Sequence, residues 1–253
     1  MKPLDGFDVS EFTDGDITHP VYQRGSGPGV LLMHELPGMV PRCVEFATYI
    51  ASHGFTVFMP LLFGEPGAPP ATKSLTLHVC ISREFHCFAH NESSPITRWL
   101  RALCITRIRP SCPGPGIGAI GMCFTGGFVL SLFVSDMMLA PVISQPGLPF
   151  PSLQRGTGAA LGVSPEDLAE ASASTVPILG FRFQGDTICP PERFETLRSR
   201  FGSRFEGHEI PGDKHSVLTV DFVPDPNHPT FAARERVIAF LRERLSVPVV
   251  VPG

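Results

Sequence analysis

The sequence predicts an α/β fold in which one mostly parallel, doubly wound sheet is flanked by helices. Short, continuously apolar runs recur along the chain, and such runs are typical of strands that are buried on both faces. Segments with helical periodicity separate these runs, so strands and helices alternate. The first such unit, residues 29–60, holds a strand, a helix and a second strand, and βαβ units of this kind are right-handed with parallel strands.

The N-terminal elements follow from simple patterns. Residues 1–20 alternate loosely and predict a short antiparallel hairpin that feeds the sheet. The run GVLLMHE at 29–35 predicts the first buried strand. A helix is expected over 41–54, because proline begins it and glycine ends it. The run FTVFMP at 55–60 predicts the second buried strand.

The middle of the chain is more interrupted. Residues 61–72 are rich in proline and glycine and predict a loop at the rim of a site. From 75 to 109 the pattern is helical but broken at Pro95. A third buried strand, 116–121, then leads into a helix over 124–135.

The remaining elements continue the alternation. They are a strand at 139–144, a loop and cap-like segment to about residue 175, a strand at 176–184, a turn and helix at 185–201, a strand at 203–210 and an amphipathic helix at 228–245. No internal repeat or low-complexity segment interrupts the chain, so we expect a single domain over residues 1–253.

Composition indicates an ordinary globular protein, with 43% hydrophobic and 17% charged residues. The net charge of −4 comes without any basic run, so nucleic acid is not an expected partner. The N-terminus has no apolar signal region, and no run of membrane-spanning length occurs, so neither simple export nor a membrane location is expected. Seven cysteines, scattered without framework spacing, predict reduced thiols and a cytoplasmic protein. We expect a monomer or homodimer.

The segment 118–127, GAIGMCFTGG, predicts a nucleophile at Cys123. It reads G-x-nucleophile-x-x-G, followed at once by Gly127, and joins a strand to a helix. A nucleophile on so sharp a turn lies in strained backbone and needs small neighbours. The turn also puts the thiol at a helix N-terminus, where the helix dipole favours thiolate. The alternative is a buried cysteine that only packs.

A thiol nucleophile needs an imidazole, and the imidazole needs an orienting carboxylate. In a fold of this kind the catalytic residues follow one another along the chain in the order nucleophile, acid, histidine. Asp186 closes FRFQGD after the fifth strand, and His215 follows the sixth strand in GDKHS. The rival histidine, His208, lies inside a predicted strand. The rival acids, Asp213 and Asp221, are too near His215 in sequence to come from a separate strand end.

A fourth strand end, HELPG at 34–38, predicts the oxyanion hole. One backbone N–H comes from the residue after the nucleophile, Phe124, and the other from this early loop, where Leu36 is the natural donor. Glu35 would then lie close to the thiol and be partly buried, which requires a partner for its carboxylate. The alternative for Glu35 is a solvated loop acid.

These motifs resemble the dienelactone hydrolase family of α/β-hydrolases, from HELPG to the final helix. The family's elbow commonly reads G-x-C-x-G-G, whereas this chain reads GMCFTGG, with Thr125 as the additional residue. The resemblance assigns the nucleophile, acid and base to Cys123, Asp186 and His215. It also implies that Glu35 is an active-site glutamate, which holds the resting thiol neutral and takes its proton when substrate binds.

The resemblance further implies lactone substrates whose carboxylate is held by arginines. Arg83 is one candidate, with a plain surface arginine as its alternative, but the second arginine expected after the histidine is absent from HSVLTVDF at 215–222. The aromatic side chains that indicate a more apolar acyl or alcohol pocket are Phe85, Phe88, Trp99 and Phe124. The sequence therefore predicts a hydrolase of small esters or lactones that requires no cofactor.

Two other function classes remain as alternatives. A thiol redox protein would use Cys123 as its reactive thiol and Cys189 as the resolving partner. A non-catalytic ligand-binding member of the fold would keep the pocket without the activity. A metal site in the His- and Cys-rich segment at 78–90 is a further, less favoured alternative, because the spacing fits no common zinc pattern.

Overall fold

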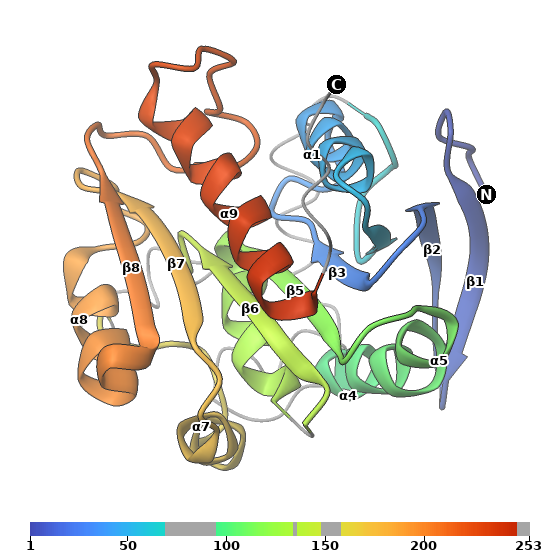
Figure 1. The fold of residues 1–253 in the computed structure, drawn as a ribbon, viewed down its shortest axis with the longest axis horizontal. Helices are drawn as coiled ribbons and strands as arrows, with labels where there is room; N and C mark the ends of the chain where they lie inside the picture. The colour runs from blue at the N-terminus through green and yellow to red at the C-terminus, as the bar shows by residue number, and fades with distance from the viewer. Residues whose placement is uncertain (69–94, 134–135, 148–157, 247–253) are drawn as a thin grey trace.

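The computed structural model describes residues 1–68, 95–133, 136–147 and 158–246. Its centre is an eight-stranded sheet of order β1-β2-β4-β3-β5-β6-β7-β8 (Figure 1). The first two strands form the expected antiparallel hairpin, and β2 also pairs antiparallel with β4. All other neighbouring strands are parallel. The predicted α/β fold with a mostly parallel sheet is therefore confirmed.

The strands fall close to the apolar runs that predicted them. They are β1 (Asp8–Asp14), β2 (Ile17–Gly25), β3 (Gly29–Met33), β4 (Thr56–Pro60), β5 (Ile117–Met122), β6 (Met138–Ser144), β7 (Ile178–Phe183) and β8 (Phe205–Ile210). Successive β3 residues point to opposite faces, and both faces are buried. Such burial on two sides explains why β3, β4, β5 and β7 read as continuous apolar runs.

Helices cover both faces of the sheet. The helical elements are α1 (Pro41–Ser52), α4 (Pro95–Leu103), the π-helix η2 (Cys104–Ile108), α5 (Arg109–Ser111), the 3₁₀ helix η3 (Cys123–Leu132), α7 (Pro165–Ala173), α8 (Pro191–Phe201), η4 (Gly202–Arg204) and α9 (Pro229–Leu245). Buried side chains of α1 and α9 form one core cluster with one face of the sheet. Side chains of α4, η3, α7 and α8 form the core of the other face. Within the described residues, no helix combines the length and apolar character that crossing a bilayer requires.

Three elements differ from the sequence-based expectation. The strand expected at 29–35 ends at Met33, so that the polar pair after it lies in a loop. The helix expected from Phe124 begins one residue earlier and is a 3₁₀ helix within the described part. The loop expected up to residue 175 contains α7, which begins at Pro165 behind the N-cap Ser164. Of the helical pattern expected from 75 to 109, the part before Pro95 lies outside the described residues.

Candidate active site

The predicted chemistry-bearing residues follow strands that are neighbours in the sheet. Glu35 comes two residues after β3, and Cys123 directly follows β5. Asp186 and His215 follow β7 and β8, which pair with each other. Because these strands are parallel, their carboxyl ends meet at one edge of the sheet, and sites of open α/β sheets form there.

Cys123 occupies a strained turn. Its φ is 51°, a left-handed conformation that side chains other than glycine rarely adopt. Gly121 leaves the room that this turn needs, because a Cβ there would collide with the Thr125 carbonyl oxygen and lie 2.7 Å from Val129 Cγ2. A Cβ on Gly126 would lie 3.0 Å from the backbone of Pro146. Larger residues would therefore be sterically crowded at positions 121 and 126. Backbone strain like that of Cys123 is typical of functional sites.

Thr125, the additional residue of the elbow, ties the turn to the sheet. Its Oγ1 accepts a hydrogen bond from the Met122 N–H at 3.0 Å. The same hydroxyl lies 3.1 Å from the Met33 carbonyl oxygen, to which it can donate, at the end of β3. Thr125 is fully buried and lies inside η3. It thus connects the nucleophile turn to the strand that precedes the HELPG loop.

Asp186 and His215 are hydrogen-bonded to each other. His215 Nδ1 lies 2.7 Å from Asp186 Oδ2, so Nδ1 carries the proton that this carboxylate accepts. The other carboxylate oxygen, Oδ1, accepts the backbone N–H groups of Ile188 at 2.8 Å and Cys189 at 3.1 Å. Burial would raise the pKa of Asp186, but the hydrogen bonds from His215 and these two amides hold that pKa below its usual value.

The second ring nitrogen of His215 is turned away from the acid. Nε2 is buried and has no hydrogen-bond partner among the described residues. Burial opposes a charge on the imidazole, yet a negative charge on Cys123, together with Asp186, raises the pKa of His215 to about 11. A base that is held by a carboxylate and interacts electrostatically with a cysteine has the chemistry needed to activate that thiol.

The rival residues have other partners. His208 lies in β8, where it pairs with Glu206 at 2.7 Å and stacks on Phe181. Asp221 Oδ2 accepts the backbone N–H of His215 at 3.1 Å and that of Ser216 at 2.9 Å. Asp221 therefore shapes the loop that carries the histidine, while a different acid contacts the imidazole.

Glu35 is fully buried and held by three polar side chains. Oε2 accepts hydrogen bonds from Ser216 Oγ at 2.8 Å and from Gln145 Nε2 at 3.0 Å, and Oε1 accepts one from Thr219 Oγ1. Burial raises the pKa of Glu35, while the hydrogen bond from Thr219, the charge of His215 and the hydrogen bonds from Ser216 and Gln145 oppose that rise. Its carboxylate thereby links the end of β3 to the end of β6 and to the histidine loop.

His34, beside this acid, supports the loop in its neutral form. Its Nε2 accepts the backbone N–H of Leu62 at 3.0 Å, which leaves the proton on Nδ1, 3.3 Å from the Glu35 carbonyl oxygen. Burial lowers the pKa of His34 to about 4, so the ring is uncharged at neutral pH. The ring also packs edge-on against Phe63.

The two expected oxyanion donors lie in the segments that follow β5 and β3. Phe124 directly follows Cys123 at the start of η3 and is buried. Leu36, partly buried in the HELPG loop, packs against the core cluster that contains Cys123 and Phe124. Some of the predicted residues lie outside the part of the chain that the structure describes. They are Arg83, Phe85, Phe88 and the His- and Cys-rich segment at 78–90. Within the described part of the chain, no three His, Cys, Asp or Glu side chains gather as a metal site would require.

Several residues at the site were not anticipated from the sequence: His34, Gln145, Arg193, Ser216 and Thr219. Gln145, which donates to Glu35, has a φ of 32° directly after β6. Its place at a strand end was the available signal. Arg193, on α8, is 1% exposed and donates to three backbone carbonyl oxygens. The sequence pattern could not predict this burial, because a charged residue near the start of an amphipathic helix is normally expected to be exposed.

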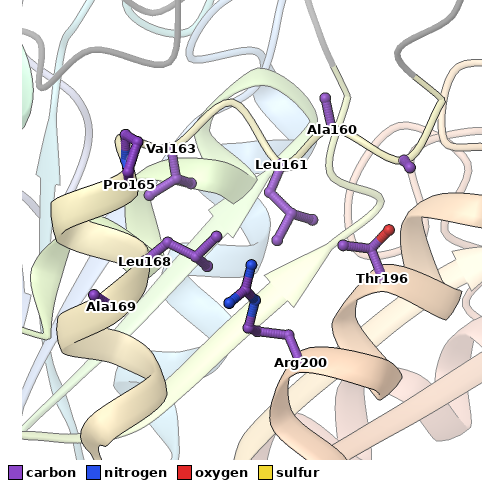
Figure 2. A pocket seen from close by; sticks show the side chains of 9 residues that line it. Ala160, Leu161, Val163, Pro165, Leu168, Ala169, Thr196 and Arg200 are labelled. Carbon is purple, nitrogen blue, oxygen red and sulfur yellow. The ribbon is translucent and has the colours of Figure 1, made fainter.

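A separate cavity of about 410 Å³ lies between α7 and α8 (Figure 2). Apolar side chains dominate its wall, among them Leu161, Val163 and Leu168, and the Arg200 side chain points toward it. None of the predicted triad residues lines this cavity. It is therefore distinct from the edge of the sheet where Cys123 and His215 lie.

The chain matches the model of the Dienelactone hydrolase family over residues 14–243. No curated protein matches it. Many solved structures do. A putative dienelactone hydrolase from Klebsiella pneumoniae subsp. pneumoniae MGH 78578 is 15% identical with a TM-score of 0.65, and the match covers 94% of this chain and 100% of that chain.

Two further solved structures have the same fold. The dienelactone hydrolase-like promiscuous phosphotriesterase P91 from metagenomic libraries is 18% identical, with a TM-score of 0.67 over 94% of this chain and 98% of that chain. A thermophilic esterase from the Planctomycetes species Thermogutta terrifontis is 14% identical, with a TM-score of 0.59 over 94% of this chain and 92% of that chain. At these identities the similarity shows a common fold.

Proposed function

The chain belongs to the dienelactone hydrolase family, and from this we propose that it hydrolyses small carboxylic esters or lactones through a thioester on Cys123. The family match supports a hydrolase. The bond that is cleaved and the residues that cleave it are inferred from the site. We expect a small-molecule substrate, no nucleic-acid or membrane partner, and no cofactor.

The observation that carries this proposal is the pairing of His215 with Asp186 at 2.7 Å, which leaves Nε2 buried and unbonded. That arrangement supports a base that can accept the thiol proton of Cys123. The positive φ of Cys123 supports its assignment as a nucleophile on an elbow. A cysteine that served only as packing would require neither feature.

The proposed reaction has two halves. Cys123 gives its proton to His215 Nε2, and the sulfur attacks the ester carbonyl carbon to form a tetrahedral oxyanion. The backbone N–H groups of Leu36 and Phe124 stabilise this oxyanion. Collapse breaks the bond to the alcohol oxygen, which takes the proton from His215 and leaves a thioester. A water molecule then gives a proton to His215 and attacks the thioester. The C–S bond breaks, the acid is released and His215 returns the proton to the Cys123 sulfur, while Asp186 keeps the imidazole oriented throughout.

The anchoring of Glu35 bears on how the thiol is activated. To take the thiol proton, as the family likeness implies, the carboxylate would have to exchange a hydrogen bond from Ser216, Thr219 or Gln145 for one from Cys123. In the resting arrangement these three bonds hold it instead. We therefore propose His215 as the direct base and Glu35 as the group that holds the oxyanion loop against the histidine loop.

The side chains around Glu35 favour uncharged substrates. The family likeness implies a second arginine shortly after the histidine, but this stretch has none, and its Thr219 hydroxyl donates to the buried acid. The neighbouring Val217 and Leu218 are fully buried. Carboxylate recognition depends on guanidinium geometry, which this segment lacks. We propose neutral esters and lactones as better substrates than carboxylate-bearing ones.

The redox alternative receives less support. Cys189 is fully buried, and burial raises the pKa of its thiol to about 12. A thiol that stays protonated at neutral pH is a poor partner for disulfide exchange. The five cysteines among the described residues are all buried and reduced.

The proposal is tested by incubating the protein with p-nitrophenyl acetate and with neutral and carboxylate-bearing enol-lactones. We expect a burst of product, an acyl adduct on Cys123 by mass spectrometry, and loss of both in Cys123→Ala. Hydrolysis by Cys123→Ala at the parent rate would reject Cys123 as the nucleophile. Thiol-peroxidase turnover without hydrolysis would favour the redox class, and ligand binding without either activity would favour the non-catalytic class.

A further inference from the structure

Arg193 is a buried arginine beside the candidate site. It lies in the first turn of α8 and is 1% exposed. Its Nη1 donates to the Pro146 carbonyl oxygen at 2.8 Å and to the Ile188 carbonyl oxygen at 2.9 Å, while Nε donates to the Ala160 carbonyl oxygen at 2.8 Å. One guanidinium therefore joins backbone from three separate parts of the chain.

The carbonyl of Pro146 belongs to the peptide unit that supports the nucleophile. The nitrogen of that unit is Gly147 N, whose N–H donates to the Cys123 carbonyl oxygen at 3.0 Å. Gly147 also lies against the thiol, because a Cβ added there would be 3.5 Å from Cys123 Sγ. Fixing the Pro146 carbonyl thus fixes the peptide that lines the nucleophile.

The carbonyl of Ile188 belongs to the peptide unit that supports the acid. The nitrogen of that unit is Cys189 N, whose N–H donates to Asp186 Oδ1 at 3.1 Å, and Ile188 N–H donates to the same oxygen at 2.8 Å. Fixing the Ile188 carbonyl thus fixes the amides that orient the carboxylate. Arg193 holds both carbonyls with the same nitrogen, so it connects the nucleophile turn with the acid loop.

We propose that Arg193 is a positioning residue that sets the spacing between Cys123 and the Asp186–His215 pair by bracing the Pro146 and Ile188 carbonyls. This inference rests on the proposed function. It assigns Arg193 no contact with substrate. Because proton transfer and attack require the reacting atoms to lie within a narrow range of distances, a brace between the two halves of the site controls the rate of acylation.

The charge of Arg193 supports the same role. Burial lowers the pKa of its guanidinium, while interactions with Cys189, Cys123 and Asp186 oppose that change. Guanidinium nonetheless stays protonated in proteins, so a positive charge remains near the thiol. A cation close to a cysteine favours its thiolate form. Lysine would keep this charge but could not reproduce the planar fork that reaches the three carbonyls.

The test compares Arg193→Gln, which removes the charge, with Arg193→Lys, which keeps it. For each protein, the rate of Cys123 alkylation by iodoacetamide is measured as a function of pH by mass spectrometry, and acylation by p-nitrophenyl acetate is measured in single turnovers. We expect Arg193→Gln to acylate on the order of 10²-fold more slowly, with its alkylation profile shifted to higher pH. Arg193→Lys should recover the profile in part but not the acylation rate.

The matched control is Arg200→Gln, on the same helix but exposed, which should behave as the parent. A folded Arg193→Gln protein with the parent's alkylation profile and acylation rate would overturn the inference. If Arg193→Gln does not fold, Arg193→Lys is compared with the parent in its place. Amide hydrogen exchange in the parent protein provides a further measurement. The Gly147 and Cys189 amides should exchange with deuterium as slowly as those of the core strands, and fast exchange there would also overturn the inference.

These readings separate the inference from the proposed function. Alkylation reports on the thiol whether or not an ester is cleaved. A shifted alkylation profile in Arg193→Gln, in a parent protein that hydrolyses no ester, would support the positioning role and reject the ester hydrolase. Ester hydrolysis at the parent rate in Arg193→Gln would support the ester hydrolase and reject the positioning role.

Discussion

His215 Nδ1 lies 2.7 Å from Asp186 Oδ2, and this contact fixes which nitrogen of the imidazole faces the rest of the site. With one proton on Nδ1, the buried Nε2 is the nitrogen that takes the thiol proton, and the raised pKa of His215 favours the imidazolium that results. The proposed mechanism depends on this tautomer. Residues that hold Asp186 in place therefore control the base, although they never contact a substrate.

Asp186→Asn should preserve the fold and lower kcat on the order of 10³- to 10⁴-fold, because an amide can stabilise the wrong tautomer and cannot stabilise the imidazolium. Steady-state hydrolysis of p-nitrophenyl acetate measures the loss. Asp213→Asn is the control, since Asp213 is an exposed acid of the same region. Equal losses in the two variants would reject Asp186 as the orienting acid.

The sequence could predict the strands and the residues at their ends, because both depend on local pattern. Buried strands read as apolar runs, and the elbow requires its glycines wherever it occurs. The helix α7 was missed because its residues are mostly small and weakly amphipathic, although Ser164 before Pro165 was a capping signal. Arg193 could not be predicted, since its three carbonyl partners come from segments that only the folded chain brings together.

Gly121→Ala should destabilise the protein by about 2 kcal/mol, because the added Cβ would press on the Thr125 carbonyl oxygen and on Val129. Both neighbours belong to η3, so the strain should also disturb the nucleophile turn and slow acylation. Urea unfolding and single-turnover kinetics measure the two effects. Gly158→Ala is the matched control, because a Cβ there has only an ordinary contact of 3.5 Å with Pro190. If Gly121→Ala proves as stable as Gly158→Ala, the close contacts of Gly121 with Thr125 and Val129 are wrong.

Glu35→Ala should destabilise the protein by about 3 kcal/mol, because it leaves the buried groups of Gln145, Ser216 and Thr219 without their acceptor. Glu35→Gln keeps one acceptor oxygen and should be less destabilised. Chemical unfolding measures both, with the exposed Glu65→Ala as control.

The same pair of variants tests the role of Glu35 in activation. If His215 is the direct base, folded Glu35→Gln should retain hydrolysis within about tenfold of the parent, a loss that a modest shift of the loop accounts for. Complete loss of thiol reactivity in a folded Glu35→Gln protein would instead favour proton transfer from the thiol to Glu35. Alkylation by iodoacetamide distinguishes the two outcomes without any substrate.

The raised pKa of His215 predicts a pH dependence of stability. The imidazole has a pKa of about 11 in the folded protein, against about 6.5 in an unfolded chain. Protonation therefore stabilises the folded state fully below about pH 6.5, and this contribution declines as the pH rises toward the folded pKa. The stability advantage of the parent over His215→Gln should shrink over that range in chemical unfolding. An advantage that grew with pH would contradict the imidazolium in the folded state.

Removing the thiol should lower the pKa of His215, because a negative charge on Cys123 is the largest influence that favours the imidazolium. Titration of the imidazole by NMR in Cys123→Ala measures the change. Cys104→Ala is the control, since Cys104 is a buried cysteine of η2 and is not among the main influences on the His215 pKa. Asp186 remains in both variants, so its effect cancels in the comparison. An imidazole that titrates identically in the two proteins would mean that Cys123 and His215 do not interact, and the proposed nucleophile would then lack its base.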